Sequence, residues 1–178
     1  SNGYWKGLYV FNASKKSILD HTKISNLSAL EDGILQLTGA ITFYNSEVDL
    51  NNVVISDIIA EDAINIVHSK YSMNKISILD AASDAFDSDF SDGKITDSSF
   101  KNIAGDGIDF SGSKATIKNV NISSIGDKGI SAGEQSTILI SNVSISIFFC
   151  SNWCARSSLI LFKFKAKFFL FSGSSEPK

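Results

Sequence analysis

The chain contains few of the residue types on which disulfide frameworks, metal centres and basic ligand sites depend. Its 178 residues include one proline, two cysteines and two histidines, and Arg156 is the single arginine. Two cysteines, Cys150 and Cys154, are too few to indicate a disulfide framework or a cysteine-rich metal site. No window combines helical spacing with caps, and no apolar run reaches the ~18 residues of a membrane span. Helical repeats, disulfide scaffolds and membrane-spanning helices are therefore not predicted.

Charge is divided unevenly along the chain. Residues 1–146 carry 18 acidic and 11 basic side chains, a net charge of −7, whereas residues 147–178 carry one acidic and five basic side chains. Phosphate binding requires a basic surface. We therefore expect the first 146 residues not to bind nucleic acid.

A repeat of fixed length occupies the middle of the chain. Short acidic motifs precede four apolar residues spaced 22 positions apart: Ile64, Phe86, Ile108 and Ile130. A similar motif, Glu31-Asp32-Gly33-Ile34, lies 30 residues before Ile64, so one repeat has about eight extra residues, which we place near 39–49. A constant period in the twenties predicts stacked supersecondary units.

Each unit has the pattern of short strands joined by turns. Runs such as Thr116–Ile122 and Thr137–Ile145 alternate apolar with polar residues, and clusters of Gly, Asn, Asp and Ser separate them. The pattern predicts turns of a parallel β-solenoid, in which equivalent residues lie ~4.8 Å apart. Stacking would form two apolar columns and one hydroxyl column: Ile34, Ile64, Phe86, Ile108 and Ile130; Phe100, Ile122 and Ile145; and Ser69, Ser91 and Ser113.

Several of these motifs carry a resemblance to a known superfamily. Leu37–Tyr44, Glu61–Asn65, Ser83–Asp87, Asp106–Asp109 and Lys128–Ser131 resemble segments of right-handed parallel β-helix (pectin-lyase-like) proteins, and of bacterial β-helix repeat proteins without an assigned activity. The resemblance implies an all-β, single-stranded right-handed parallel β-helix of about six coils with a 22-residue repeat over residues 1–146. It also implies an extracellular or cell-surface location, as part of a larger exported protein.

Residues 147–178 differ from the repeats in composition. They are basic and hold seven of the 13 phenylalanines. The alternation of Phe162–Phe168 predicts a terminal strand that covers the end of the solenoid. The alternative hypothesis is a frameshift near 145–152, because the shifted frame can encode another β-helix coil.

Carboxylates recur at two positions of the repeat. Asp62, Asp84 and Asp106 stand two residues before the apolar anchors, and Asn65, Asp87 and Asp109 stand directly after them. We expect Asp87 and Asp109 to face solvent about 5 Å apart, with Asp89 on the same face. Such acids bind a hard cation, act as a catalytic pair, or stabilise turns through backbone amides. The candidate calcium ligands are Asp87, Asp89 and Asp109.

The candidate catalytic acids are Asp84, Asp87, Asp106 and Asp109. Asp106-Gly107-Ile108-Asp109 is similar to a catalytic phrase of polygalacturonases, but that family's paired aspartates, Gly-His-Gly and Arg-Ile-Lys are absent. A separation of about 5 Å suits a retaining glycosidase. A lyase needs a strong base beside its acids, and we do not predict Lys94, Lys114 or Lys128 opposite them. Asp62, Asp84 and Asp106 are interpreted as structural because they recur in every coil.

The candidate sugar-binding residues are Phe43 and Tyr44, if the extra residues project as a loop; otherwise one or both pack inside the coil. His68 is expected on the surface at a strand end. We predict a non-catalytic β-helix scaffold or carbohydrate-facing surface module that requires no cofactor. The alternative is an enzyme similar to polysaccharide lyases or glycoside hydrolases, using stacked aspartates.

Overall fold

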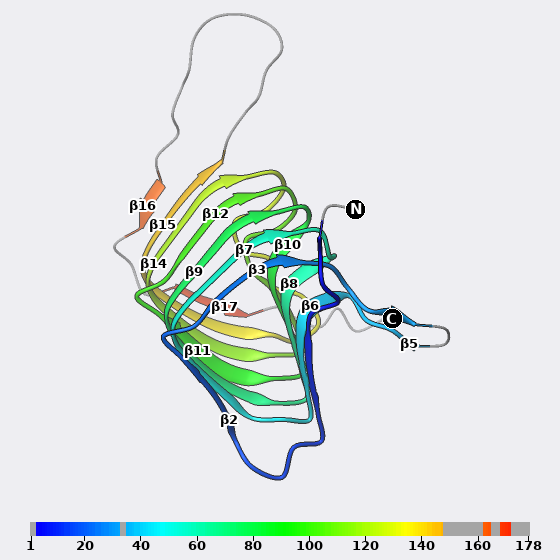
Figure 1. The fold of residues 1–178 in the computed structure, drawn as a ribbon. Helices are drawn as coiled ribbons and strands as arrows, with labels where there is room; N and C mark the ends of the chain where they lie inside the picture. Colours follow the sequence, from blue (N-terminus) through cyan, green and yellow to red (C-terminus); the bar gives the residue numbers. More distant parts are fainter. Residues whose placement is uncertain (1–2, 33–34, 148–161, 165–167, 172–178) are drawn as a thin grey trace, which may run out of the picture.

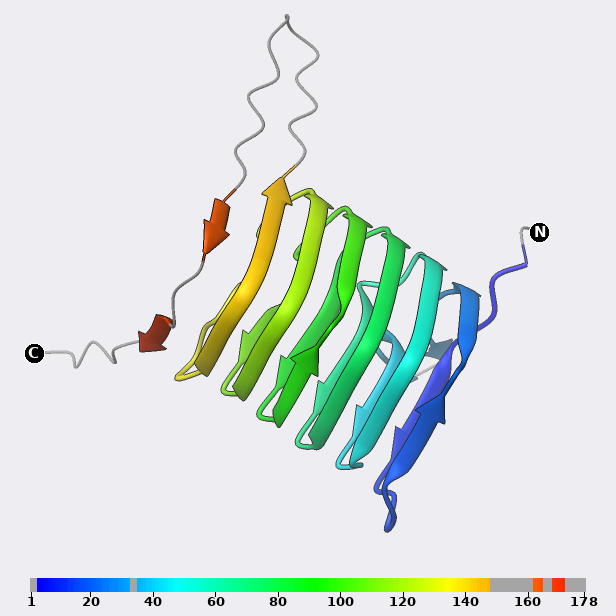
Figure 2. The same ribbon diagram turned by 90° about the vertical axis from the view of Figure 1, so that its left-hand side faces the viewer.

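The protein is a solenoid of parallel strands. The computed structural model describes residues 3–32, 35–147, 162–164 and 168–171, and every regular element within them is a strand (Figure 1). Strands of successive turns lie side by side, and in the longer sheet they follow sequence order from blue to yellow (Figure 2). The predicted all-β parallel solenoid is confirmed.

Two sheets form the walls of the solenoid. The shorter sheet contains, in order, β1 (Leu8–Phe11), β6 (Gly39–Tyr44), β8 (Asp62–Val67), β10 (Asp84–Asp89) and β13 (Asp109–Ser111). The longer sheet contains β2 (Ser17–Asp20), β3 (Lys23–Leu27), β7 (Val48–Ile58), β9 (Lys70–Ala81), β11 (Asp92–Thr96), β12 (Ser99–Ile103), β14 (Lys114–Ile125) and β15 (Thr137–Ile147).

The number of turns is about five, where about six were expected. The shorter sheet has five strands. Beside β15, the last parallel strand of the longer sheet, the described residues of the opposite wall form only isolated bridges at Ile130 and Gly133. The last level is therefore a partial turn.

The core consists of the stacked apolar columns. Ile41, Ile64 and Phe86 are aligned by strand register, and each is at most 1% exposed. Ile34, the expected first member, lies outside the described residues, and Ile41 occupies that level. The second column is confirmed, because Phe100, Ile122 and Ile145 are aligned across β12, β14 and β15. Burying each such side chain contributes ~1.5–3 kcal/mol, so the columns are the main source of stability.

The extra residues form a hairpin, not a loop within 39–49. Strands β4 (Glu31–Asp32) and β5 (Leu35–Gln36) pair antiparallel, and they project from the body of the solenoid (Figure 1). Ile41 lies 14 positions after Leu27, whereas their register partners Ile58 and Ile64 are six positions apart. The predicted number of about eight extra residues is confirmed, but their predicted position near 39–49 is wrong. The Glu31–Ile34 motif is similar in sequence to the start of a coil, and this similarity caused the error.

Polar ladders join successive turns at the corners. The backbone N–H groups of Ser46, Ser69, Ser91 and Ser113 donate at 2.9–3.1 Å to the hydroxyls of Ser69, Ser91, Ser113 and Ser136. The predicted serine ladder is confirmed as structural. These hydroxyls satisfy backbone groups that would otherwise be buried without partners.

Two short strands cover the last turn. Strands β16 (Phe162–Phe164) and β17 (Phe168–Phe171) pair antiparallel with β15. Pairing of this kind removes an exposed sheet edge. β16 lies within the predicted strand Phe162–Phe168, and β17 begins at its last residue. Residues 165–167 lie outside the described residues, so a single terminal strand stays a prediction. The frameshift hypothesis stays a prediction.

Candidate functional site

The shorter sheet carries the predicted columns of acids. Asp62 is the register partner of Asp84, and Asp87 pairs with Asn65 on one side and Asp109 on the other. The parallel register brings equivalent side chains of successive coils into contact distance. The acids on this wall, Asp62, Asp84, Asp87, Asp89, Asp106 and Asp109, are called the acidic face below.

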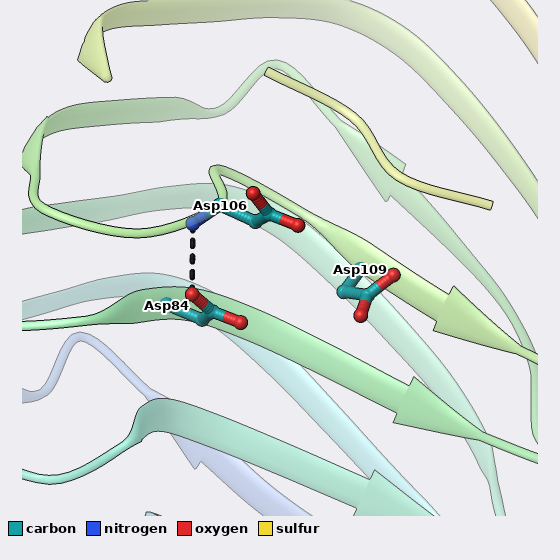
Figure 3. Close-up of side chains that lie close together, drawn as sticks. All are labelled: Asp84, Asp106 and Asp109. Carbon is teal, nitrogen blue, oxygen red and sulfur yellow. Dashed lines mark hydrogen bonds between the residues drawn. The ribbon is translucent and has the colours of Figure 1, made fainter. Parts of the chain in front are cut away.

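Two members of the first column of acids, Asp84 and Asp106, accept hydrogen bonds from the backbone of the next coil. The N–H of Asp106 donates to Oδ1 of Asp84 at 2.8 Å (Figure 3). The N–H of Lys128 likewise donates to Oδ1 of Asp106 at 2.8 Å. Gly105 makes the first bond possible, because a Cβ at that position would lie 2.0 Å from Oδ1 of Asp84. The turn role predicted for Asp84 and Asp106 is confirmed.

Lys128 lies directly on the acidic face, contrary to expectation. Its Nζ donates to both carboxylate oxygens of Asp106 at 3.0 Å and also to Asp127. Hydrogen bonds to Asp127 and then to Asp106 raise the pKa of Lys128. The lysine was missed because it stands 22 residues after Asp106, where the repeat motif would place another acid. An ammonium held in this way is a poor proton acceptor.

In the second column of acids, which contains Asp87 and Asp109, Asp87 is held by the side-chain amide of Asn65. Nδ2 of Asn65 donates to Oδ2 of Asp87 at 2.8 Å and more weakly to Oδ2 of Asp89 at 3.4 Å. Oδ1 of Asp109 accepts the N–H of Phe110. Asp87 and Asp109 are half-buried, so the expected solvent-facing placement holds only in part.

Two acids of this face resist ionisation. Burial, reinforced by the charges of Asp84, Glu61 and Asp89, raises the pKa of Asp62 to about 7. Burial, reinforced by Asp89, Asp62 and Asp109, raises the pKa of Asp87 to about 8. Both effects disfavour the carboxylate, because a charge loses hydration and meets like charges. Near neutral pH, the acidic face therefore retains protons.

Three acids come closest to a cation-binding geometry. One carboxylate oxygen from each of Asp84, Asp106 and Asp109 lies within 4.8 Å of the others. Asp109 was among the expected calcium ligands, whereas Asp87 and Asp89 share the Asn65 amide instead. Figure 3 shows Asp84 and Asp106 joined through the Asp106 amide, with Asp109 to one side. The calcium site stays a prediction.

The two candidate sugar-binding aromatics have different environments. Phe43, a residue of β6, is 0% exposed and packs in the core, so no ligand reaches it. Tyr44, the last residue of the same strand, is 39% exposed. Alternation along the strand sends the two neighbours in opposite directions. Of the pair, only Tyr44 remains a candidate.

Tyr44 belongs to an exposed row of rings that crosses four turns. Ring centroids are separated by 5.9 Å from Phe11 to Tyr44, 6.0 Å from Tyr44 to His68 and 5.2 Å from His68 to Phe90. Phe11, Phe90 and the surface-predicted His68 are all exposed. We call these four residues the aromatic row. Sequence reasoning missed it, although His68 and Phe90 keep the 22-residue spacing directly before Ser69 and Ser91.

A hollow of about 590 Å³ lies beside the aromatic row. His68 and Phe90 line it together with residues from the corners of neighbouring turns. Its charged lining consists of three lysines and two acids: Lys15, Lys16, Lys70, Glu47 and Asp92. Lys16 is paired with Asp49 at 3.0 Å, so the rest of this lining carries balanced charge.

These features define a parallel β-solenoid with two distinct side-chain rows on its surface. A family model described as the right handed beta helix region matches residues 1–145. The chain belongs to this right-handed β-helix family, and it is consistent with the pectin-lyase-like superfamily that the sequence motifs resemble. No curated protein matches the chain. Among the described residues, no helix has the length and apolar character needed to cross a bilayer.

Proposed function

We propose that the chain is a non-catalytic β-helix scaffold that presents a carbohydrate-facing surface as part of a larger exported protein. The supporting observation is the use of the acids within the fold. Asp84 and Asp106 accept backbone N–H groups of the next coil, and Asp87 accepts the Asn65 amide. Groups engaged in this way connect the turns, and connecting turns is the task of a scaffold.

The lysine on the acidic face supports the same conclusion. β-Elimination needs a neutral base that removes a proton from the sugar. Lys128 instead contacts two carboxylates, and its pKa is raised by them. A general base works best when its pKa lies near the working pH. The two carboxylates raise the pKa of Lys128 further above neutral pH.

A second candidate function is polysaccharide cleavage by the acidic face. Its specific support is the pKa of Asp87, which is raised to about 8 beside Asp89 and Asp109. A carboxyl group that is protonated at neutral pH can donate its proton to the leaving oxygen of a glycosidic bond, while a neighbouring carboxylate acts as the nucleophile or base. Calcium prefers carboxylate oxygens as ligands. If it bound Asp87, Asp89 and Asp109, these acids would hold a structural ion and would not act in catalysis.

One experiment separates these functions. The purified chain is incubated with acidic and neutral polysaccharides, with and without calcium, and new reducing ends and unsaturated products are measured. We expect binding of at least one polysaccharide and no cleavage. Cleavage that is lost in both Asp87→Asn and Asp109→Asn would establish the enzymatic alternative. A calcium-dependent rise in melting temperature that these variants lose would identify the cation site.

A further inference from the structure

The aromatic row follows a line in space and not a single position of the repeat. Phe11 and Tyr44 are register partners at the last position of the short strands. In the next two turns that position holds Val67 and Asp89, and the rings come from the following residues, His68 and Phe90. Despite this shift, the ring centroids of Tyr44 and His68 are only 6.0 Å apart. The row is therefore continuous although the repeat positions that form it change.

The backbone disfavours a phenylalanine at the last of these positions. His68 and Phe90 have φ values of 50° and 48°, in the left-handed region. The equivalent residues in other turns are Asn12 and Asn45, with φ values of 51° and 46°, and Gly112, with a φ of 61°. Asparagine, histidine and glycine accept this conformation more readily than phenylalanine, for which it costs ~1–2 kcal/mol. The left-handed backbone belongs to the corner itself, because it recurs in each of these turns, and the phenylalanine at Phe90 is the departure from it.

The Phe90 ring has open surroundings that a side chain at the next level would fill. Phe90 is 56% exposed, and a Cβ on Gly112 would lie 2.6 Å from its Cδ1. The glycine therefore leaves room for the ring to extend over the next turn. A large exposed apolar surface beside polar groups is typical of a binding site.

The hollow indicates the chemistry of the occupant. Apart from the Lys16–Asp49 pair, two lysines and two acids face it, namely Lys15, Lys70, Glu47 and Asp92. Balanced donors and acceptors suit hydroxyl groups, each of which both donates and accepts. A strongly charged ligand would meet repulsion from one pair or the other. The ring separations of 5.2–6.0 Å are comparable to the length of one sugar unit in an extended chain.

We propose that the aromatic row and the hollow form the binding site for an extended chain of neutral sugars, which runs along the solenoid axis from Phe11 to Phe90. The proposal rests on the proposed carbohydrate-facing function and gives it a location, a direction and a ligand class. Sugar rings contact the exposed aromatic side chains, and the polar lining of the hollow binds their hydroxyls. Because successive rings come from successive turns, longer oligosaccharides contact more of the row.

The test is calorimetric titration of the full chain with neutral oligosaccharides of increasing length, and with uronic acid oligosaccharides for comparison. We expect affinity for the neutral series to increase with length until the row is spanned. Phe90→Ser and Tyr44→Ser should each weaken binding about tenfold. Ile59→Ser is the matched control, because Ile59 is a 53% exposed apolar residue outside the row. Circular dichroism melting shows whether each variant is folded.

The outcomes distinguish this proposal from the proposed function. Glycan binding that the row variants retain in full would overturn the site and leave the carbohydrate-facing function intact. Binding of uronic acid oligosaccharides alone would overturn the ligand class. Failure of the wild-type chain to bind any glycan would overturn both proposals. Self-association that Phe90→Ser abolishes would make the row an interface between copies and would also overturn the site.

Discussion

The acidic face and the aromatic row are both products of stacking, yet their side chains are used differently. In the acidic face, Asp106 is 5% exposed and bonds to the backbone and ammonium groups of Lys128. In the aromatic row, Phe90 is 56% exposed and its ring stacks on that of His68. One row connects turns through partners inside the fold, whereas Tyr44, Phe11 and Phe90 of the other are 39%, 42% and 56% exposed to solvent.

This difference separates scaffold from binding surface in a repeat protein. A polar side chain that bonds to the next coil strengthens the interface between neighbouring turns, and such interfaces add to the intrinsic stability of the repeats in a solenoid. An exposed ring pair contributes only ~0.5–1.5 kcal/mol, and each ring leaves apolar area in water. Substitutions in the acidic face should therefore lower stability more than glycan binding. Substitutions in the aromatic row should lower glycan binding more than stability.

Of the substitutions in the two surface rows, Asp106→Ala is expected to have the largest effect on stability. The substitution leaves the N–H of Lys128 without its acceptor and removes both contacts of Asp106 with Nζ. Loss of a buried acceptor and ion-pair partner costs ~2–4 kcal/mol. Equilibrium denaturation should show this loss as a lower midpoint.

Asp127→Ala is the matched control for that substitution. Asp127 contacts the same Nζ, but its side chain is 65% exposed. Exposed ion pairs contribute ~0–1 kcal/mol. Equal losses of stability in Asp106→Ala and Asp127→Ala would contradict the structural role assigned to Asp106.

The next effect is a dependence of stability on pH. Asp62 and Asp87 have folded-state pKa values of about 7 and about 8, above the ordinary value of 3.8. Between pH 4 and pH 8, the folded state thus binds more protons than the unfolded state, so the free energy of unfolding decreases as pH rises. Denaturation at a series of pH values should show this loss as a midpoint that falls steadily from pH 4 to pH 8.

Asp87→Asn tests the origin of this slope. Asparagine cannot ionise, so the variant should have a flatter profile and should be more stable than the wild type at pH 8, near the folded-state pKa of Asp87. Glu134→Gln, at an exposed residue of the last turn, is the control. An unchanged slope in Asp87→Asn, matching that of Glu134→Gln, would assign the pH dependence to other groups.

The sequence predicted what the 22-residue period determines directly. The parallel solenoid, the Phe100 column, the serine ladder and the turn role of Asp84 and Asp106 all follow from stacking of equivalent positions. These features depend only on the period, because each residue meets its counterpart in the next turn.

Features that depart from the period were missed. The Glu31–Ile34 motif suggested a coil, but its first two residues form strand β4, which pairs antiparallel with β5. Lys128 stands where the repeat motif suggested an acid. The aromatic row changes repeat position between Tyr44 and His68, so no single spacing identifies it. Finding such a feature requires the positions of side chains around a corner, which are set by left-handed backbone conformations at each turn.

The smallest effect on stability is expected within the aromatic row itself. Phe90→Asn removes a ring pair worth ~0.5–1.5 kcal/mol and relieves a left-handed phenylalanine that costs ~1–2 kcal/mol. The two changes oppose each other, so the denaturation midpoint should stay close to that of the wild type. Phe86→Ala, which empties a fully buried position of the core column, is the contrasting variant and should lose ~3–5 kcal/mol. A loss in Phe90→Asn approaching that of Phe86→Ala would mean that the row, like the acidic face, connects turns. If instead stability is kept while oligosaccharide binding is lost, the row contributes to ligand recognition and not to the fold.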